Sequence, residues 1–129
     1  MAEVFVDDYS NIATFANADE VFTALNYPVY FRARGSIANN EPMSRFSDTF
    51  AQSQLLFGDA LSDMAVFFEN HDNPRFLSEA NDLKKYENAI ALIHTWTGIP
   101  TLYYGCEQDM AGGNDPDNRR PLWEFGYNQ

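Results

Sequence analysis

The sequence has little cysteine, few basic residues and no long hydrophobic run. Its 129 residues include one cysteine, Cys106, which excludes an internal disulfide framework. Lys and Arg number 8 against 19 Asp and Glu, and the net charge of −11 argues against nucleic acid or an anionic membrane as the main partner, because both would repel the chain. No apolar run approaches the ~18 residues of a membrane-spanning helix. The first eight residues lack the basic and apolar regions of a signal peptide, so we expect none in this stretch.

Several motifs of nucleotide, hydrolase and metal sites are also missing. The sequence contains no Gly-rich phosphate loop and no Gly-x-Ser-x-Gly nucleophile elbow. Glu69, His71 and Asp72 could supply metal ligands, but they complete neither a zinc spacing nor a calcium-loop pattern. The turn around Asp115 lacks the later Gly and Glu of an EF-hand loop. We therefore expect no metal or cofactor site within this chain.

What the chain does contain is a globular composition and an alternation of segment types. Hydrophobic residues make up 45% and charged residues 21%, which is typical of one folded domain. The pattern predicts short buried strands at residues 3–6, 24–31, 64–68 and 99–104, a polar loop after the first of these, and helices at residues 42–57 and 81–97. Apolar strands alternating with amphipathic helices indicate parallel pairing in an α/β layer. Four strands fit an open sheet and half of an eight-stranded barrel equally well.

Finer features of these segments follow from single residues. Pro28 should sit at an end or a bulge of its strand. Met43, Phe46 and Phe50 share one face of the first helix at helical spacing. The second helix should begin at Asn81 or Asp82, whose side chains can cap it, and stop at the Gly-Ile-Pro sequence of residues 98–100.

The densest polar cluster follows the strand predicted at residues 64–68. Asn70, His71 and Asp72 offer an amide, an imidazole and a carboxylate at a strand's carboxyl end, where α/β proteins place binding and catalytic groups. The residue types fit a site that binds hydroxyl groups, and equally a hydrogen-bonded loop that connects strand to helix. Glu3 also ends a predicted strand and could be a second carboxylate, as glycoside hydrolysis requires, although a lone Glu near a terminus is ordinarily solvated surface. His94 lies on the second helix and is expected to be a surface or packing residue.

Three ordered stretches resemble a known family. They are residues 68–76 (FENHDNPRF), 98–108 (GIPTLYYGCEQ) and 112–119 (GGNDPDNR). They resemble three segments of fungal-type members of the α-amylase family of glycoside hydrolases. In order, these are the segment after the seventh barrel strand, the eighth strand with the residues that follow it, and the substrate-binding loop beyond. Residues 3–5 and 25–30 fit the fifth and sixth strands. The resemblance covers essentially the whole chain.

The resemblance implies a fold, an activity and a location. It implies an α/β fold that is a partial TIM (β/α)8 barrel, strands five to eight, with residues 1–129 forming the C-terminal half of the catalytic domain, since a complete barrel takes about 250 residues. It implies a retaining enzyme that cleaves α-1,4-glucosidic bonds in starch-like glucans, with an α-glucan or maltooligosaccharide as partner. It also implies an extracellular protein, and the sequence pI of about 4.3 is compatible with that.

The resemblance also assigns roles to five residues. Glu3 matches the general acid/base, and Asp72 matches the carboxylate that stabilises the transition state. His71 matches the imidazole that hydrogen-bonds the same sugar, and Asp115 and Arg119 match a pair that contacts glucose units on the non-reducing side. The family's nucleophile, an Asp at the end of the fourth strand, and its Ca2+ ligands would lie upstream of Glu3. We therefore expect this chain alone to be inactive.

Some residues depart from the family pattern, and two further functions stay open. Ala2 stands where Gly is usual, Val6-Asp7-Asp8 replaces a loop that usually contains Gly, Cys106 is unusual between Gly105 and Glu107, and Arg120 stands where Glu is usual. The open functions are a non-catalytic sugar-binding half-barrel and an α-glucosidase or transglycosylase of the same family. The loop at residues 114–119 favours an endo-acting amylase, because in the family it lines subsites distant from the cleaved bond.

Overall fold

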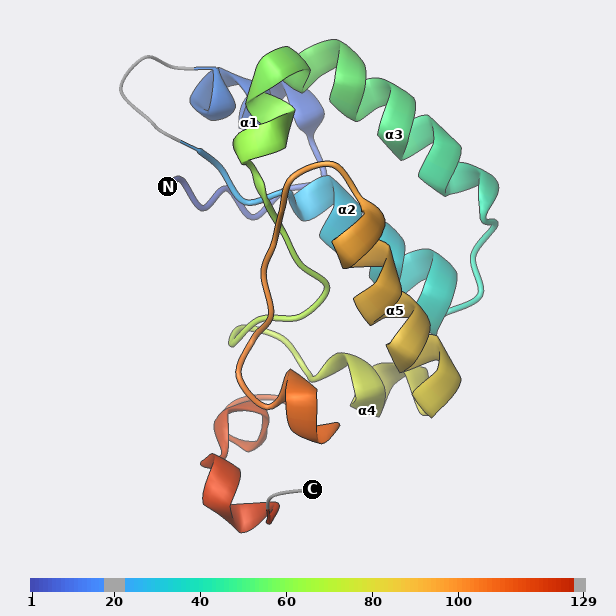
Figure 1. Cartoon of the computed structure of the whole chain (residues 1–129), viewed down its shortest axis with the longest axis vertical. Coiled ribbons are helices and arrows are strands. Elements are labelled where there is room, and N and C mark those ends of the chain that lie inside the picture. Colours follow the sequence, from blue (N-terminus) through green and yellow to red (C-terminus); the bar gives the residue numbers. More distant parts are fainter. Residues whose placement is uncertain (18–22, 127–129) are drawn as a thin grey trace.

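Four extended segments pair in chain order in the computed structural model, which describes residues 1–17 and 23–126. Figure 1 shows the α-helices that accompany them. Ala2 bridges in parallel to Ala24, and Leu25 bridges in parallel to Ala65. The strand β1 (Ala65–Val66) then pairs in parallel with β2 (Ile99–Pro100). Parallel segments that each pair with the next along the chain form the wall of a barrel, whereas a doubly wound open sheet reverses its order part-way.

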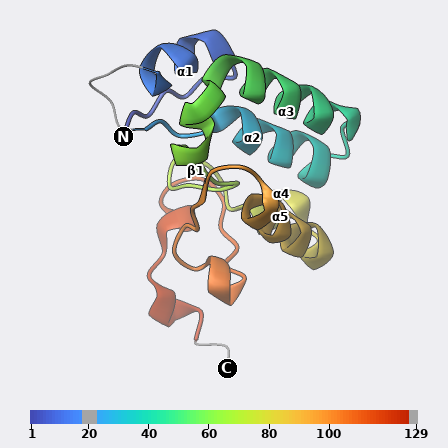
Figure 2. The same ribbon diagram turned by 45° about the horizontal axis from the view of Figure 1, so that its top comes forward.

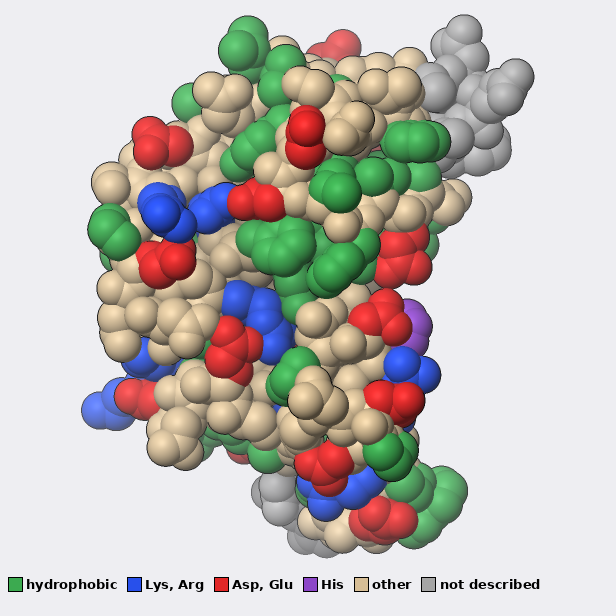
Figure 3. Space-filling view, turned by 180° about the vertical axis from the view of Figure 1, so that it is seen from behind, with side chains coloured by type: hydrophobic (Ala, Val, Ile, Leu, Met, Phe, Trp, Pro, Cys, Tyr) green, Lys and Arg blue, Asp and Glu red, His purple; other side chains and the backbone are tan. Residues whose placement is uncertain are grey.

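Helices connect and cover these segments. They are α1 (Tyr9–Ala16), α2 (Tyr27–Arg32) with a π-helical continuation (Ala33–Ala38), α3 (Ser44–Phe57) with a 3-10 continuation (Gly58–Asp63), α4 (Phe76–Ala80) and α5 (Leu83–Thr95). Short 3-10 turns follow at Cys106–Gln108, Asp117–Arg119 and Leu122–Glu124. Figure 2 shows α1, α2 and α3 on one side of β1 and the C-terminal turns on the other. Acidic side chains are spread over the rear face, as the net charge requires (Figure 3).

Two hydrophobic clusters meet at β1. Val66 and Phe68 belong to a cluster shared with α2, α4 and α5, whereas Phe67 belongs to a second cluster shared with α1, α2 and α3. Successive strand residues point to opposite faces, so a segment covered on both faces is apolar throughout. Residues 64–68 are all buried, as predicted, and strand pairing within them is limited to Ala65–Val66.

The strand predicted at residues 24–31 is wrong beyond its first two residues. Only Ala24 and Leu25 form bridges, and α2 begins at Tyr27. The Asn26 side chain caps this helix by accepting from Val29 N at 3.3 Å, and Pro28 lies in its first turn, where the missing N–H costs nothing. Because α2 is buried on most sides, its apolar run has the same sequence pattern as a buried strand.

The polar loop predicted after Asp7-Asp8 is instead α1. The Asp8 carboxylate accepts from the backbone N–H groups of Ser10 and Asn11 at 2.9 and 3.1 Å, which caps the helix. Ile12 and Ala16, four residues apart, supply the buried side of α1. An eight-residue helix with two buried positions is too short for its period to be recognised in sequence.

The two predicted helices are confirmed as α3 and α5, with some faces corrected. In α3 the buried positions are Phe46, Thr49, Ser53 and Phe57. Met43 is exposed and Phe50 is nearly half exposed, since Phe50 lies at the border of this stripe, with its ring 5.6 Å from that of Trp96. In α5 the cap is Asp82, whose carboxylate accepts from Lys84 N at 2.8 Å.

The buried strand predicted at residues 99–104 is shorter and more exposed than expected. Strand pairing covers Ile99–Pro100, and Ile99 and Leu102 are 52% and 47% exposed. Within the described residues β2 pairs along one edge, with β1, so its other side has no neighbour there to cover it.

Candidate active site

The loops that follow the four parallel segments surround one cavity of about 190 Å³. Its lining comes from every segment: Glu3, Leu25, Phe67, Glu69, Asn70, His71, Thr101, Leu102 and Tyr103. The cavity therefore lies at the carboxyl ends of the parallel segments, which is the end where β/α barrels assemble their active sites.

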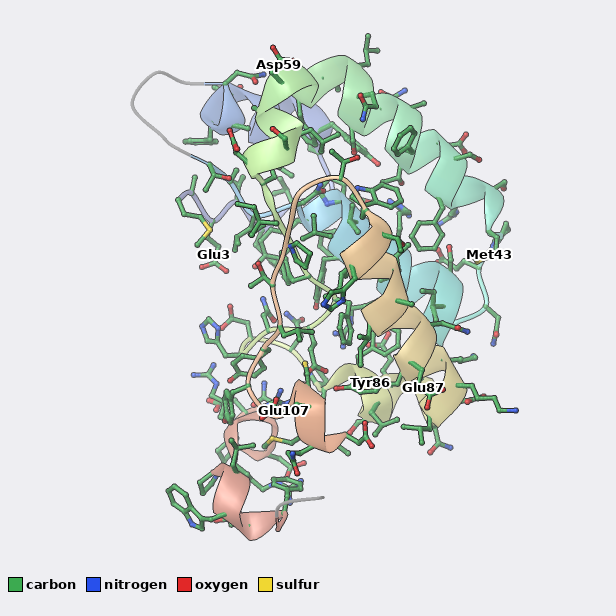
Figure 4. All side chains as sticks on the ribbon, viewed as in Figure 1. Glu3, Met43, Asp59, Tyr86, Glu87 and Glu107 are labelled. Carbon is green, nitrogen blue, oxygen red and sulfur yellow. The ribbon has the colours of Figure 1, made fainter. Side chains whose placement is uncertain are left out.

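Glu3 is held at this cavity by a buried tyrosine. The Tyr27 hydroxyl donates to Glu3 Oε1 at 2.7 Å, and Asn70 Nδ2 donates to the same hydroxyl at 3.2 Å. Burial raises the pKa of Tyr27 well above its ordinary value, and the carboxylates of Glu3 and Asp72 act in the same direction. The hydroxyl therefore stays protonated and keeps donating to Glu3. Figure 4 shows the Glu3 side chain pointing away from α1 and α3, toward the loop after β1.

The polar residues of the loop after β1 differ in their surroundings, since Asn70 is buried and His71 and Asp72 lie partly at the surface. Asn70 is buried, and its Oδ1 accepts from Asp72 N at 3.2 Å and from Asn73 Nδ2 at 3.0 Å. His71 Nε2 lies 3.2 Å from Asp72 Oδ1, and both side chains are about half exposed. Asn70 thus holds the loop together, while the side chains of His71 and Asp72 lie partly at the surface.

The loop at residues 112–119 brings the other two predicted site residues to the same place. Arg119 Nε lies 3.2 Å from Asp115 Oδ1, and its Nη2 lies 3.5 Å from Asp72 Oδ1. Arg119 Nε also donates to the carbonyl oxygen of His71 at 2.9 Å. All five predicted site residues therefore converge: four are in direct contact, and Glu3 joins them through Tyr27 and Asn70.

Beneath these side chains lies a buried ion pair that the sequence did not reveal as part of the site. Arg75 Nη1 lies 2.9 Å from Glu69 Oε1, and both side chains are 0% exposed. The Arg75 guanidinium also stacks over the Tyr103 ring at 4.1 Å. Both charged residues fall within the motif at residues 68–76 and Tyr27 falls within residues 25–30, so the resembling stretches were the available signal.

The unusual Cys106 packs against this ion pair. Its Sγ donates to Glu69 Oε1 at 3.0 Å, and its side chain is buried. Burial, reinforced by the Glu69 carboxylate, raises the pKa of the Cys106 thiol to about 12. The thiol is therefore a protonated donor.

Neither a metal site nor a membrane helix is found in the described part of the chain. Among residues 1–17 and 23–126, no three His, Cys, Asp or Glu side chains gather as a metal site requires. The calcium implied by the family resemblance stays a prediction about residues upstream of Glu3. No helix in the same ranges is long and apolar enough to cross a membrane.

Comparison with known proteins decides the family. The family model of the alpha-amylase catalytic domain matches residues 1–128. The chain belongs to the alpha-amylase family. It is 40% identical over 135 residues to alpha-amylase 1 of Lipomyces kononenkoae, a match that covers 98% of this chain and 20% of that protein.

Solved alpha-amylase family structures give the same result in three dimensions. An alpha-amylase from Malbranchea cinnamomea matches with a TM-score of 0.88 at 33% identity, covering 98% of this chain and 26% of that one. A cyclomaltodextrin glucanotransferase, CldA, matches with a TM-score of 0.84 at 32% identity, covering 97% and 26%. The chain thus spans a fifth to about a quarter of these relatives. Together with the chain-order pairing, this confirms the prediction of a partial TIM barrel.

Proposed function

We propose that this chain supplies the general acid/base, Glu3, and the transition-state stabiliser, Asp72, of a retaining α-amylase. The enzyme would cleave α-1,4-glucosidic bonds in starch-like glucans. The observation that carries the proposal is the hydrogen-bonded path from the Glu3 carboxylate through Tyr27 and Asn70 to the backbone of Asp72, beside one cavity at the carboxyl ends of parallel strands.

Each group has a defined task in this reaction. Protonated Glu3 gives its proton to the leaving glycosidic oxygen, and its carboxylate later takes a proton from the attacking water, a contribution of ~10²–10⁴-fold. Asp72 accepts hydrogen bonds from sugar hydroxyls and stabilises the positive charge of the oxocarbenium-like transition state. His71 donates to the same sugar, and Asp115 and Arg119 bind glucose units on the non-reducing side.

The attacking carboxylate of this reaction is proposed to come from outside the chain. In the family it is an Asp at the end of the fourth strand, upstream of the position of Glu3. Residues 1–129 would accordingly be strands five to eight, the C-terminal half of the catalytic domain. An extracellular location and an α-glucan or maltooligosaccharide partner belong to the same proposal.

The test uses the full-length enzyme and two isosteric substitutions. Glu3→Gln and Asp72→Asn should each lower kcat on a maltooligosaccharide by at least 10²-fold, because each removes a group that acts in the transition state. Glu87→Gln on α5 and Asp59→Asn after α3 are matched controls, since both side chains are exposed and lie away from the cavity (Figure 4). Retained activity in either site variant would refute that residue's role.

A second substrate separates the acid from the stabiliser. Fluoride leaves an α-maltosyl fluoride without protonation, so glycosylation of the enzyme no longer needs a general acid. The initial burst of fluoride release should therefore be largely preserved in Glu3→Gln and lost in Asp72→Asn. Equal losses on both substrates in Glu3→Gln would show that Glu3 is not the acid.

The likeness to a glucanotransferase favours one second candidate, transfer to a sugar instead of water. Both reactions use the same acid and the same stabiliser, and they differ in the acceptor. Incubating the full-length enzyme with maltoheptaose distinguishes them: an endo-acting amylase yields mixed shorter oligosaccharides early. Products longer than the substrate, or cyclic products, would establish the transferase.

A further inference from the structure

A buried guanidinium joins the three loops of the site. Besides Glu69, Arg75 donates from Nη1 to the Tyr104 carbonyl oxygen at 2.7 Å and from Nε to the Asn118 carbonyl oxygen at 2.8 Å. Its Nη2 donates to Met110 Sδ at 3.2 Å. The loops after β1, after β2 and at residues 112–119 are thus all held by one side chain. No part of that side chain is exposed, so it touches no substrate.

Asn118, whose carbonyl oxygen accepts from Arg75, also contacts the loop that carries Asp72. Its Nδ2 donates to the carbonyl oxygens of His71 at 2.7 Å and Asn73 at 2.8 Å, the two residues that flank Asp72. Arg75 therefore fixes the main chain of Asn118, and Asn118 fixes the main chain on both sides of Asp72. We call Arg75 and Asn118 together the loop clamp.

The charge of the clamp is balanced inside the protein. Glu69 Oε1 accepts from Arg75 and from Cys106 Sγ, and Glu69 Oε2 accepts from Phe76 N at 2.9 Å. A buried ion pair that makes several further hydrogen bonds gives a fixed geometry more than net stability. The N–H groups of a planar guanidinium point in different, fixed directions, so one Arg side chain can donate to several loops at once. A Lys ammonium on its flexible side chain has no such fixed set of donors.

We propose that Arg75 and Asn118 are positioning residues, which hold Asp72 and Arg119 in the arrangement that binds the glucan in the transition state. This rests on the proposed function. Neither residue touches the sugar, and both act through the backbone. Since a displacement of about 1 Å in a catalytic group can cost about 10²-fold in rate, loosening the clamp should lower kcat more than it changes KM.

The test measures amide exchange and kinetics on the full-length enzyme with Arg75→Met, Asn118→Ala and the double variant Arg75→Met/Glu69→Gln. Arg75→Met should speed hydrogen exchange at residues 112–119 and lower kcat by about 10²-fold. The double variant removes both buried charges, so it should regain the thermal stability that Arg75→Met loses without regaining kcat. Recovery of kcat with stability would overturn the proposal, because the effect would then be merely structural.

A matched control and a second readout keep the two proposals apart. Arg34 is also a buried arginine with a carboxylate partner, Glu79, but its side chain contacts Phe68 and Pro74 instead of the 112–119 loop. Arg34→Met should leave exchange at residues 112–119 unchanged. Unchanged exchange in Arg75→Met, or faster exchange with intact kcat, would overturn the clamp. Exchange needs no substrate, so failure of Asp72→Asn to lower activity would refute the proposed function without altering the exchange result.

Discussion

The hydroxyl of Tyr27 lies between a carboxylate and an amide that are far apart in the chain. It donates to Glu3, 24 residues away, and accepts from Asn70, 43 residues away. A hydrogen bond to a charged group is worth about 1.5–3 kcal/mol, so this single group can fix the direction of the Glu3 carboxylate.

Replacing Tyr27 by Phe tests this role. In the full-length enzyme Tyr27→Phe should lower kcat about tenfold or more, because Glu3 loses the donor that orients it. Tyr9→Phe is the control, since the Tyr9 hydroxyl donates to Thr49 at 3.0 Å, between α1 and α3. Equal kcat values for the two variants would mean that Tyr27 does not orient Glu3.

The raised pKa of the Cys106 thiol leads to a second prediction about a single residue. Folding raises its pKa to about 12, whereas an unfolded chain has a Cys pKa near 8.5. As pH rises, the unfolded state therefore loses the thiol proton before the folded state does. The contribution of the protonated thiol to the free energy of unfolding is fully present below pH ~8.5. Above that pH the free energy of unfolding falls by up to about 1.4 kcal/mol per pH unit.

Denaturant unfolding between pH 8.5 and 10 measures this loss. Tyr30 and Tyr103, whose pKa values are raised to about 12 from the usual value of 10, contribute mainly at higher pH. The serine of Cys106→Ser does not ionise in this window, so the free energy of unfolding of this variant should fall less steeply than that of the parent chain. Equal slopes would contradict the raised pKa.

At the scale of elements, β1 and the turn before β2 approach so closely that only glycine fits. Gly98 has φ of +132°, and a Cβ there would lie 2.5 Å from Val66 Cγ2 and 2.7 Å from the Met64 carbonyl oxygen. The pairing of β1 with β2, which positions two of the site loops, thus depends on the missing side chain.

Gly98→Ala should accordingly destabilise the chain by more than the conformational cost alone. Gly58→Ala isolates that cost, because Gly58 also has positive φ, +51°, but has no atom within 4 Å of an added Cβ. Thermal or denaturant unfolding of both variants gives the difference. A Gly98 variant as stable as the Gly58 variant would show that the strands can separate without loss.

Local sequence signals predicted the elements unevenly, and the reasons are physical. The burial of β1 and the long helices α3 and α5 were predictable from their hydrophobic patterns, and α5 also from the Asp82 cap. At α2 a helix buried on most sides has no polar face, so its pattern matched a strand. In the site, Asp72 and His71 were predictable from their place after β1. The tyrosine and the loop clamp depend on contacts between distant residues, which no local pattern contains.

At the scale of the whole molecule, apolar side chains remain uncovered on the first and last parallel segments. Phe5 is 53% exposed and Ile99 52%. In a closed barrel both edges would be paired, and exposed strand edges invite association with other chains. The proposed function also assigns the nucleophile to a residue outside this chain.

We therefore expect the 129-residue chain alone to show no turnover. The measurement is hydrolysis of a blocked maltoheptaoside by the purified chain, with its Glu3→Gln variant as control. Turnover that disappears in the control would mean that the attacking carboxylate lies within this chain or in a second copy of it.

The pairing of each parallel segment with the next along the chain has a consequence for synthesis on the ribosome. Ala2 pairs with Ala24, which follows it by 22 residues. Leu25 pairs with Ala65 after 40 residues, and Ala65 pairs with Ile99 after 34 residues. Each new strand can dock on one that has already emerged, so nascent chains need not hold an unpaired strand for long. Growth of this kind would bury each apolar segment in the order in which it is translated.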